Sequence, residues 1–219
     1  MKLATIKYQD TTAVCAMTDN GLYLADSCYQ GENGMLNFLA AGETALSALR
    51  EKTTSDVEAL SLDQVQLLAP VIKPGKVFGV GLNYADHIAE TGRDKPEYPT
   101  FFNKQNTCVT GTGSPIHRPK VSDKLDYEGE LAIVIGKRCR HVSEKQASSV
   151  IAGFTIMNDV SVRDWQMRSH TWTLGKSFDT HGPSGPWIIT ADEIPDPHNL
   201  DIKTWVKAEL RQDFNTKEM

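Results

Sequence analysis

Three carboxylate side chains stand close together in the stretch LDYEGELAIVIG, which covers residues 125–136. Asp126, Glu128 and Glu130 alternate with other residues and come directly before the apolar run at residues 131–135. The β-branched residues of that run predict a buried strand. If the strand extends back through the acids, its period of two puts all three carboxylates on one face.

Such an arrangement is electrostatically unfavourable without a partner. Side chains two apart on a strand are roughly 7 Å apart, so each adjacent pair repels by about 2 kcal/mol at an effective dielectric constant of ~20. Either the acids lie at a solvated strand end, where water screens them, or they gather around a hard cation such as Mg²⁺, Mn²⁺ or Ca²⁺. A further carboxylate from elsewhere in the chain favours the cation.

Asp159 is the candidate for that further carboxylate. It stands at the end of the apolar segment FTIMNDV (154–160), which we expect to be another core strand. Arg163 and Gln166 follow it by four and seven residues, a spacing that puts them on one helical face. Lys176 follows Gly175 before the next expected strand, a position that favours an anion or an enolate as its partner.

His87 and Glu90 form a second candidate pair. They are three residues apart on a short expected helix that Asn83 caps and Gly92 ends. The pair is either a surface contact or part of a catalytic lid, because short glycine-flanked helices after a strand are typical of such lids. The preceding glycines are not a dinucleotide fingerprint, since Tyr84 occupies the third glycine position.

The rest of the chain supplies the elements that position these side chains. Residues 1–70 are expected to form a small leading packing module, with strands at 1–8 and 11–18 and one helix over 35–52. Residues 71–219 are expected to form the larger domain that carries the candidate site. Within it, residues 144–154 predict an amphipathic helix that leads into a core strand.

Composition limits the class of protein. The chain has 219 residues, 40% of them hydrophobic and 23% charged, as in ordinary globular proteins. Its formal charge of -5 argues against nucleic acid as a partner, and no apolar stretch is long enough for a membrane span. The four cysteines show no zinc spacing and suggest reduced intracellular thiols. We expect a cytoplasmic protein, or a mitochondrial matrix protein if the source is eukaryotic.

Four motifs in order resemble the fumarylacetoacetate hydrolase family. They are GLNYADHIAE, LDYEGELAIVIGKR, GFTIMNDVSVRDWQ and GKSFDTHGPSGPWIITADEIPDPHNL. The resemblance covers roughly residues 65–219, and DWQMR, WTLGK and DPHNL are most similar to the branch called domain-containing protein 2. It implies an α+β fold, in which a mixed β-roll follows a small N-terminal domain.

The resemblance also implies a role for each candidate residue. Two glutamates and a later aspartate hold Mg²⁺ or Mn²⁺ in the family, and they match Glu128, Glu130 and Asp159, with Asp126 as an outer neighbour. The family's histidine–glutamate dyad matches His87 and Glu90, and its active-site lysine matches Lys176. Its substrate-binding arginine and glutamine match Arg163 and Gln166.

The implied activity is metal-dependent chemistry on a small 2-oxo or 2,4-dioxo carboxylic acid, as in C–C hydrolysis of acylpyruvates through an enolate. Oxaloacetate tautomerisation or decarboxylation and hydroxymuconate-type isomerisation remain alternatives, because all pass through related enolates. The family also implies a homodimer when the fold is complete.

The sequence departs from the family in two places. Gly129 separates the glutamates where a larger residue is usual, which predicts looser ligand geometry. The final hairpin has Lys207-Ala208 where the family has Asn-Gly, and Phe214 in place of a glycine. Because the family continues beyond this hairpin with further strands, we expect a C-terminally truncated roll, and a catalytically inactive family member is a further alternative.

Overall fold

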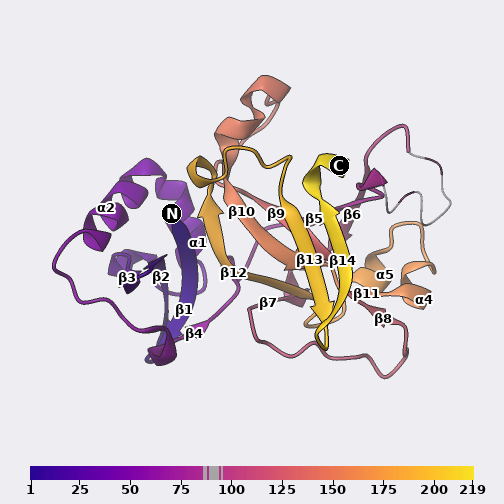
Figure 1. The fold of residues 1–219 in the computed structure, drawn as a ribbon, viewed down its shortest axis with the longest axis horizontal. Helices are drawn as coiled ribbons and strands as arrows, with labels where there is room; N and C mark the ends of the chain where they lie inside the picture. The colour runs from indigo at the N-terminus through magenta and orange to yellow at the C-terminus, as the bar shows by residue number, and fades with distance from the viewer. Residues whose placement is uncertain (86–87, 89–93, 95) are drawn as a thin grey trace.

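Strands dominate the computed structural model, which describes residues 1–85, 88, 94 and 96–219 (Figure 1). The main sheet of the described residues contains β1 (Lys2–Tyr8), β2 (Thr11–Thr18), β3 (Gly21–Leu24), β4 (Gln66–Leu67), β7 (Val109–Thr110), β9 (Gly129–Ile135), β10 (Ile151–Asn158) and β12 (Gly182–Thr190). Its order is β3-β2-β1-β12-β10-β9, with β4 paired to β1 and β7 paired to β12. The β7–β12 pair is parallel and the others are antiparallel, so the sheet is mixed.

Three two-stranded sheets and a few short helices complete the described structure. The strand pairs are β5 (Val77–Gly81) with β6 (Thr100–Lys104), β8 (Leu125–Asp126) with β11 (Ser161–Val162), and β13 (Asp201–Val206) with β14 (Glu209–Asn215). The α-helices that lie within the described residues are α1 (Gly34–Ala41), α2 (Glu43–Thr53), α4 (Arg163–Gln166) and α5 (Thr173–Lys176). The predicted α+β class is confirmed.

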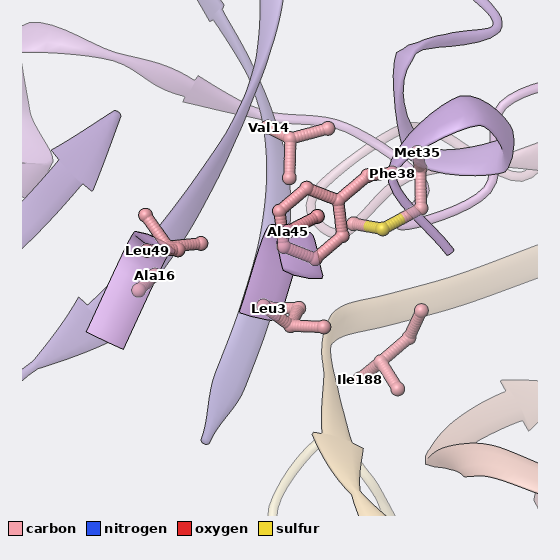
Figure 2. Close-up of a cluster of buried hydrophobic side chains, with 8 residues drawn as sticks. All are labelled: Leu3, Val14, Ala16, Met35, Phe38, Ala45, Leu49 and Ile188. Carbon is pink, nitrogen blue, oxygen red and sulfur yellow. The ribbon is translucent and has the colours of Figure 1, made fainter. Parts of the chain in front are cut away.

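One hydrophobic cluster joins the N-terminal elements to the rest of the chain. Figure 2 shows it between β1, β2, α1, α2 and β12, with the members Leu3, Val14, Ala16, Met35, Phe38, Ala45, Leu49 and Ile188. Of these eight described residues, Ile188 comes from beyond residue 70, and it is fully buried. β1 also pairs directly with β12 through Leu3 and Ile188. The division into domains at residue 70 stays a prediction, and both the sheet and the core cross it.

Two expected elements differ in the structure. The single helix expected over 35–52 is divided between α1 and α2, because Gly42 has φ 62° and ψ -137°, a conformation that no helix interior contains. The helix expected over 144–154 is a 3₁₀-helix over Glu144–Val150, after which β10 begins at Ile151. That 3₁₀-helix has no buried residues, so there is no packed face to favour a full α-helix.

The acidic stretch is also divided differently from the expectation. Asp126 lies in β8, where it pairs with Ser161 of β11, whereas β9 begins only at Gly129. The three carboxylates of residues 126, 128 and 130 therefore do not share one continuous strand. The reason lies in the tertiary structure, because β8 pairs with β11 in a separate two-stranded sheet whereas β9 pairs with β10 in the main sheet.

β9 is the last strand of the main sheet and lies beside the β13–β14 hairpin, drawn in yellow in Figure 1. On the same side of the molecule, α4 and α5 follow β11. These elements surround the candidate site. Within the described residues, no helix has the length and apolar character that crossing a bilayer requires.

Candidate metal centre

Three carboxylates meet at the end of the β9–β10 pair. Glu130 of β9 lies opposite Met157 of β10, and the amide of Asp159 donates a hydrogen bond of 2.8 Å to the carbonyl oxygen of Glu128. One carboxylate oxygen from each of Glu128, Glu130 and Asp159 lies within 4.8 Å of the other two. Strand register thus brings together acids that are far apart in the sequence.

Two buried lysines neutralise part of this negative charge. Lys176 Nζ contacts the Glu128 carboxylate and lies 2.7 Å from Asp159 Oδ2. Lys104 Nζ lies 2.6 Å from Asp159 Oδ1 on its other side. Only 3% of the Lys176 side chain and 2% of the Lys104 side chain are exposed. Because burying an unpaired ammonium group is costly, each of these lysines depends on the carboxylates of the cluster.

Lys104 was not among the residues predicted from the sequence. Its ammonium group also donates to the carbonyl oxygen of Val160, at 3.3 Å, and to that of Lys176. It therefore connects the carboxylate cluster to the end of α5. The sequence places Lys104 two residues after Phe102, and the period of two in a strand puts both side chains on one face, but nothing local shows that this face is buried.

Arg163 connects the cluster to its predicted outer neighbour. Arg163 Nη2 lies 2.6 Å from Glu128 Oε1 and 2.8 Å from Asp126 Oδ2, and Nε donates to the same Asp126 oxygen at 2.8 Å. Its Nη1 donates to Gln166 Oε1 at 3.1 Å within α4. The expected helical spacing of Arg163 and Gln166 is confirmed by this contact.

The two glutamates have opposite pKa shifts. Burial works to raise the pKa of Glu128, but the positive charges of Lys176 and Arg163 hold it below its ordinary value. Burial and the negative charges of Asp159 and Glu128 raise the pKa of Glu130 to about 8. The side chain of Glu130 forms no hydrogen bond or ion pair with any residue that the structure describes. Among the described residues, the positive charges of Lys176 and Lys104 lower the pKa of Glu130 only in part, and neither lysine forms an ion pair with its carboxylate.

That chemistry fits a divalent cation. The donors are carboxylate oxygens, the ligands that Mg²⁺ and Mn²⁺ prefer, and their 4.8 Å limit lets one ion reach all three. Burial and the charges of Asp159 and Glu128 raise the pKa of Glu130 more than Lys176 and Lys104 lower it, so a cation bound at this carboxylate would be favourable. The ligand roles themselves are proposals, taken up below.

The predicted dyad of His87 and Glu90 lies outside the described residues. Tyr84, just before it, is described, and sequence reasoning considered it only as an interrupted glycine motif. Burial, together with the negative charge of Glu130, raises the pKa of the Tyr84 phenol to about 12, and its ring packs on Phe214 of β14 with centroids 4.5 Å apart.

Comparison with known proteins identifies the family. The model of the family described as fumarylacetoacetate (FAA) hydrolase C-terminal matches residues 76–219. The chain belongs to the fumarylacetoacetate hydrolase family. The predicted resemblance and the divalent-metal character of the site are therefore consistent with one another.

Two family relatives represent the curated proteins that the chain matches. It is 45% identical over 186 residues to the protein of Rattus norvegicus called oxaloacetate tautomerase Fahd2a, mitochondrial. It is 42% identical over 187 residues to oxaloacetate tautomerase fahd2, mitochondrial, of Xenopus laevis. Each match covers 84% of this chain, but only 59% of the relative's length.

Solved structures of the family have the same fold. Maleylpyruvate hydrolase from Sphingobium sp. SYK-6, in complex with manganese (II) ion and pyruvate, has a TM-score of 0.82 and 29% identity. The 5-carboxymethyl-2-hydroxymuconate delta-isomerase from Mycobacterium smegmatis has a TM-score of 0.77 and 33% identity. All of this chain is covered in both comparisons, together with 78% and 77% of those chains.

Proposed function

We propose that this chain is part of a divalent-metal-dependent enzyme that acts on small 2-oxo or 2,4-dioxo carboxylic acids. The observation that carries the proposal is the carboxylate cluster within 4.8 Å, bordered by buried Lys176 and by Arg163. A site that combines hard-cation ligands with fixed positive charges suits an anionic substrate rich in oxygen atoms.

In this proposal each side chain has a distinct task. Glu128, Glu130 and Asp159 hold Mg²⁺ or Mn²⁺, which when bound supplies Lewis-acid polarisation of a carbonyl oxygen. Lys176 places a positive charge where a substrate oxygen gains negative charge. Arg163 and Gln166 bind the substrate. His87, oriented by Glu90, is the proposed general base that accepts the proton.

Keto–enol tautomerisation of oxaloacetate is the reaction we favour. It needs only a base that removes a proton from the carbon beside the ketone and a proton donor for the ketone oxygen, so one C–H bond breaks and one O–H bond forms. The rat relative named for this reaction is 45% identical to the chain. Its name supports the assignment.

Hydrolysis of a C–C bond in an acylpyruvate is the second candidate. In that reaction water adds to the distal carbonyl carbon, the C–C bond breaks, and the leaving carbon receives a proton. The support is the solved maleylpyruvate hydrolase in complex with manganese and pyruvate, which is 29% identical. The solved delta-isomerase supports hydroxymuconate-type isomerisation as a third candidate, which also proceeds by proton transfer to and from carbon.

The test is to assay the purified chain with oxaloacetate and with an acylpyruvate, in Mg²⁺, in Mn²⁺ and in EDTA. We expect metal-dependent enol formation from oxaloacetate to be faster than cleavage of the acylpyruvate. Glu130→Gln and Asp159→Asn should each lower the rate at least 100-fold, because removing one electrostatic group typically costs about 10²–10³ in rate. Glu144→Gln, on the exposed 3₁₀-helix, is the matched control that retains the rate.

Two outcomes contradict the proposal. Equal rates in EDTA exclude metal dependence, and no turnover of either substrate by a folded chain favours the inactive alternative. Thermal unfolding with Mn²⁺ is an independent measurement, because a ligand at 100 times its dissociation constant stabilises the native state by about 2.7 kcal/mol.

We also propose a homodimer, which light scattering of the purified chain tests. The names of the rat and Xenopus relatives include the word mitochondrial, which supports a mitochondrial matrix location if the source is eukaryotic. Microscopy of the tagged full-length protein tests the compartment.

A further inference from the structure

Gly129, between the two candidate glutamate ligands, is bound by a side chain from the C-terminal hairpin. Among the described residues β9 is the edge strand of the main sheet, so the amides on its free side face no further strand of that sheet. The amide of Gly129 donates a hydrogen bond of 2.9 Å to Gln212 Oε1 of β14. The peptide unit that joins Glu128 to Gly129 is thus held by the hairpin.

Thr204 of β13 limits the same position sterically. A Cβ atom added to Gly129 would lie 2.5 Å from Thr204 Oγ1 and 3.3 Å from Gln212 Oε1. Thr204 and Gln212 are direct cross-strand partners in the hairpin, so both side chains approach Gly129 together. The glycine that predicted looser geometry is instead required by this close approach.

The contact has a consequence for the ligands on either side. Glu128 and Glu130 extend from the residues that flank the held glycine, and Mg²⁺ accepts oxygen ligands only near ~2.1 Å, so small backbone shifts weaken binding. Outer groups that orient ligands typically contribute 10–100-fold to metal affinity. We propose that the β13–β14 hairpin positions the glutamate pair, with Gln212 and Thr204 as positioning residues of the metal centre. This inference rests on the proposed metal site.

The first test measures Mn²⁺ affinity from the electron paramagnetic resonance signal of free Mn²⁺. Gln212→Met keeps the length of the side chain but removes the acceptor, and we expect its dissociation constant to rise about tenfold. Gln212→Glu keeps an acceptor and retains wild-type or tighter binding. Leu210→Met is the matched control, because Leu210 is an exposed residue of the same strand. This variant should retain wild-type affinity.

The second test is a double-mutant cycle between the strand and the hairpin. Gly129→Ala collides with Thr204 Oγ1, and we expect it to weaken Mn²⁺ binding about tenfold or more. In Gly129→Ala/Thr204→Ala the hydroxyl is gone, and the built Cβ lies 3.8 Å from the Cβ of residue 204. The double variant is therefore expected to recover most of the lost affinity.

The outcomes separate the two proposals. If the folded wild-type chain binds no Mn²⁺, the metal site of the proposed function is wrong. If the wild type binds but Gln212→Met binds equally well, or the double variant binds no better than Gly129→Ala, the hairpin inference is wrong. The melting temperature of each variant is also measured in EDTA. A purely structural role would lower this temperature without changing the Mn²⁺ dissociation constant of the folded protein. If Gln212→Met does not fold, the hairpin inference is decided by whether Gly129→Ala/Thr204→Ala recovers the Mn²⁺ affinity that Gly129→Ala loses.

Discussion

Asp159 is the residue on which the site's electrostatics depend. Its two carboxylate oxygens face different lysines, Lys104 at 2.6 Å and Lys176 at 2.7 Å, in a region almost closed to water. Removing one partner of a buried ion pair is costly because the remaining charge loses its compensation. Lys104 is therefore expected to contribute both to folding and to the orientation of Asp159.

We predict that Lys104→Met lowers the free energy of unfolding in EDTA by about 3 kcal/mol, measured by urea denaturation. Lys104→Met/Asp159→Asn should lose less than the sum of the single variants, because the two residues interact directly. Lys124→Met, which removes an exposed lysine 4.0 Å from Asp123, is the control and should change little. Wild-type stability of Lys104→Met would contradict the prediction.

The buried thiol of Cys15 should make the stability of the protein depend on pH in the alkaline range. Burial raises the pKa of Cys15 from 9.0 to about 12, so above pH 9 the unfolded chain releases this proton before the folded chain does. The stability contributed by the protonated thiol is complete below pH 9 and falls as the pH rises toward 12. By about pH 10.5 the loss should be about 2 kcal/mol.

Urea denaturation at several pH values measures this loss. Cys15→Ala should flatten the slope above pH 9, whatever its effect at neutral pH, whereas Cys28→Ala, at an exposed position, should leave the slope unchanged. An equal slope in wild type and Cys15→Ala would show that other groups cause the alkaline loss.

Among the secondary-structure elements, the β13–β14 hairpin combines a functional contact with a strained turn. Lys207 and Ala208 form a two-residue turn between Val206 and Glu209, with φ values of 50° and 65°. Such turns favour Asn-Gly, because non-glycine residues are strained at positive φ. Lys207-Ala208, which replaces the family's Asn-Gly, therefore keeps the positive-φ two-residue turn and does so in a strained backbone conformation.

We predict that Ala208→Gly stabilises the protein by about 1 kcal/mol, since it relieves a left-handed conformation. Lys207→Asn in addition should increase the gain. Ala40→Gly, at an exposed position of α1, is a control of opposite sign and should destabilise by about 1 kcal/mol. Thermal unfolding checks all three, and a destabilised Ala208→Gly would show that the turn is not strained.

For the whole molecule, the shared core decides how the chain unfolds. Ile188 of β12 is fully buried among residues of the N-terminal elements, and its strand pairs with β1. A boundary at residue 70 inferred from local patterns therefore crosses one sheet and one hydrophobic cluster. Segments that share a core are expected to unfold together.

We predict a single cooperative transition by calorimetry, with equal calorimetric and van't Hoff enthalpies. Ile188→Ala should lower the free energy of unfolding by about 3 kcal/mol while the transition stays single. Ile133→Ala, at an exposed position of β9, is the matched control with little effect. Two separate transitions would instead support independent domains.

Much of the site could be inferred from local patterns. The acids before a β-branched run and the aspartate at the end of a second apolar segment predict two strand ends, which antiparallel pairing can place together. Glu128, Glu130 and Asp159 are accordingly adjacent in the structure. The choice of Glu128 and Glu130 over Asp126 came from the family resemblance, and the expectation of one strand through all three acids was wrong. The spacing of Arg163 and Gln166 likewise reflects one helical turn, which the chain encodes locally.

The remaining features depend on contacts between segments distant in sequence. Lys104 enters the cluster from β6 of the β5–β6 strand pair, and Gln212 reaches Gly129 from the β13–β14 hairpin. Side-chain periodicity tells which face of an element is buried, but it carries no information about which other element will cover that face. The order of strands and the packing of hairpins decide that, because each buried charge and each free backbone amide must find its partner across the assembled fold.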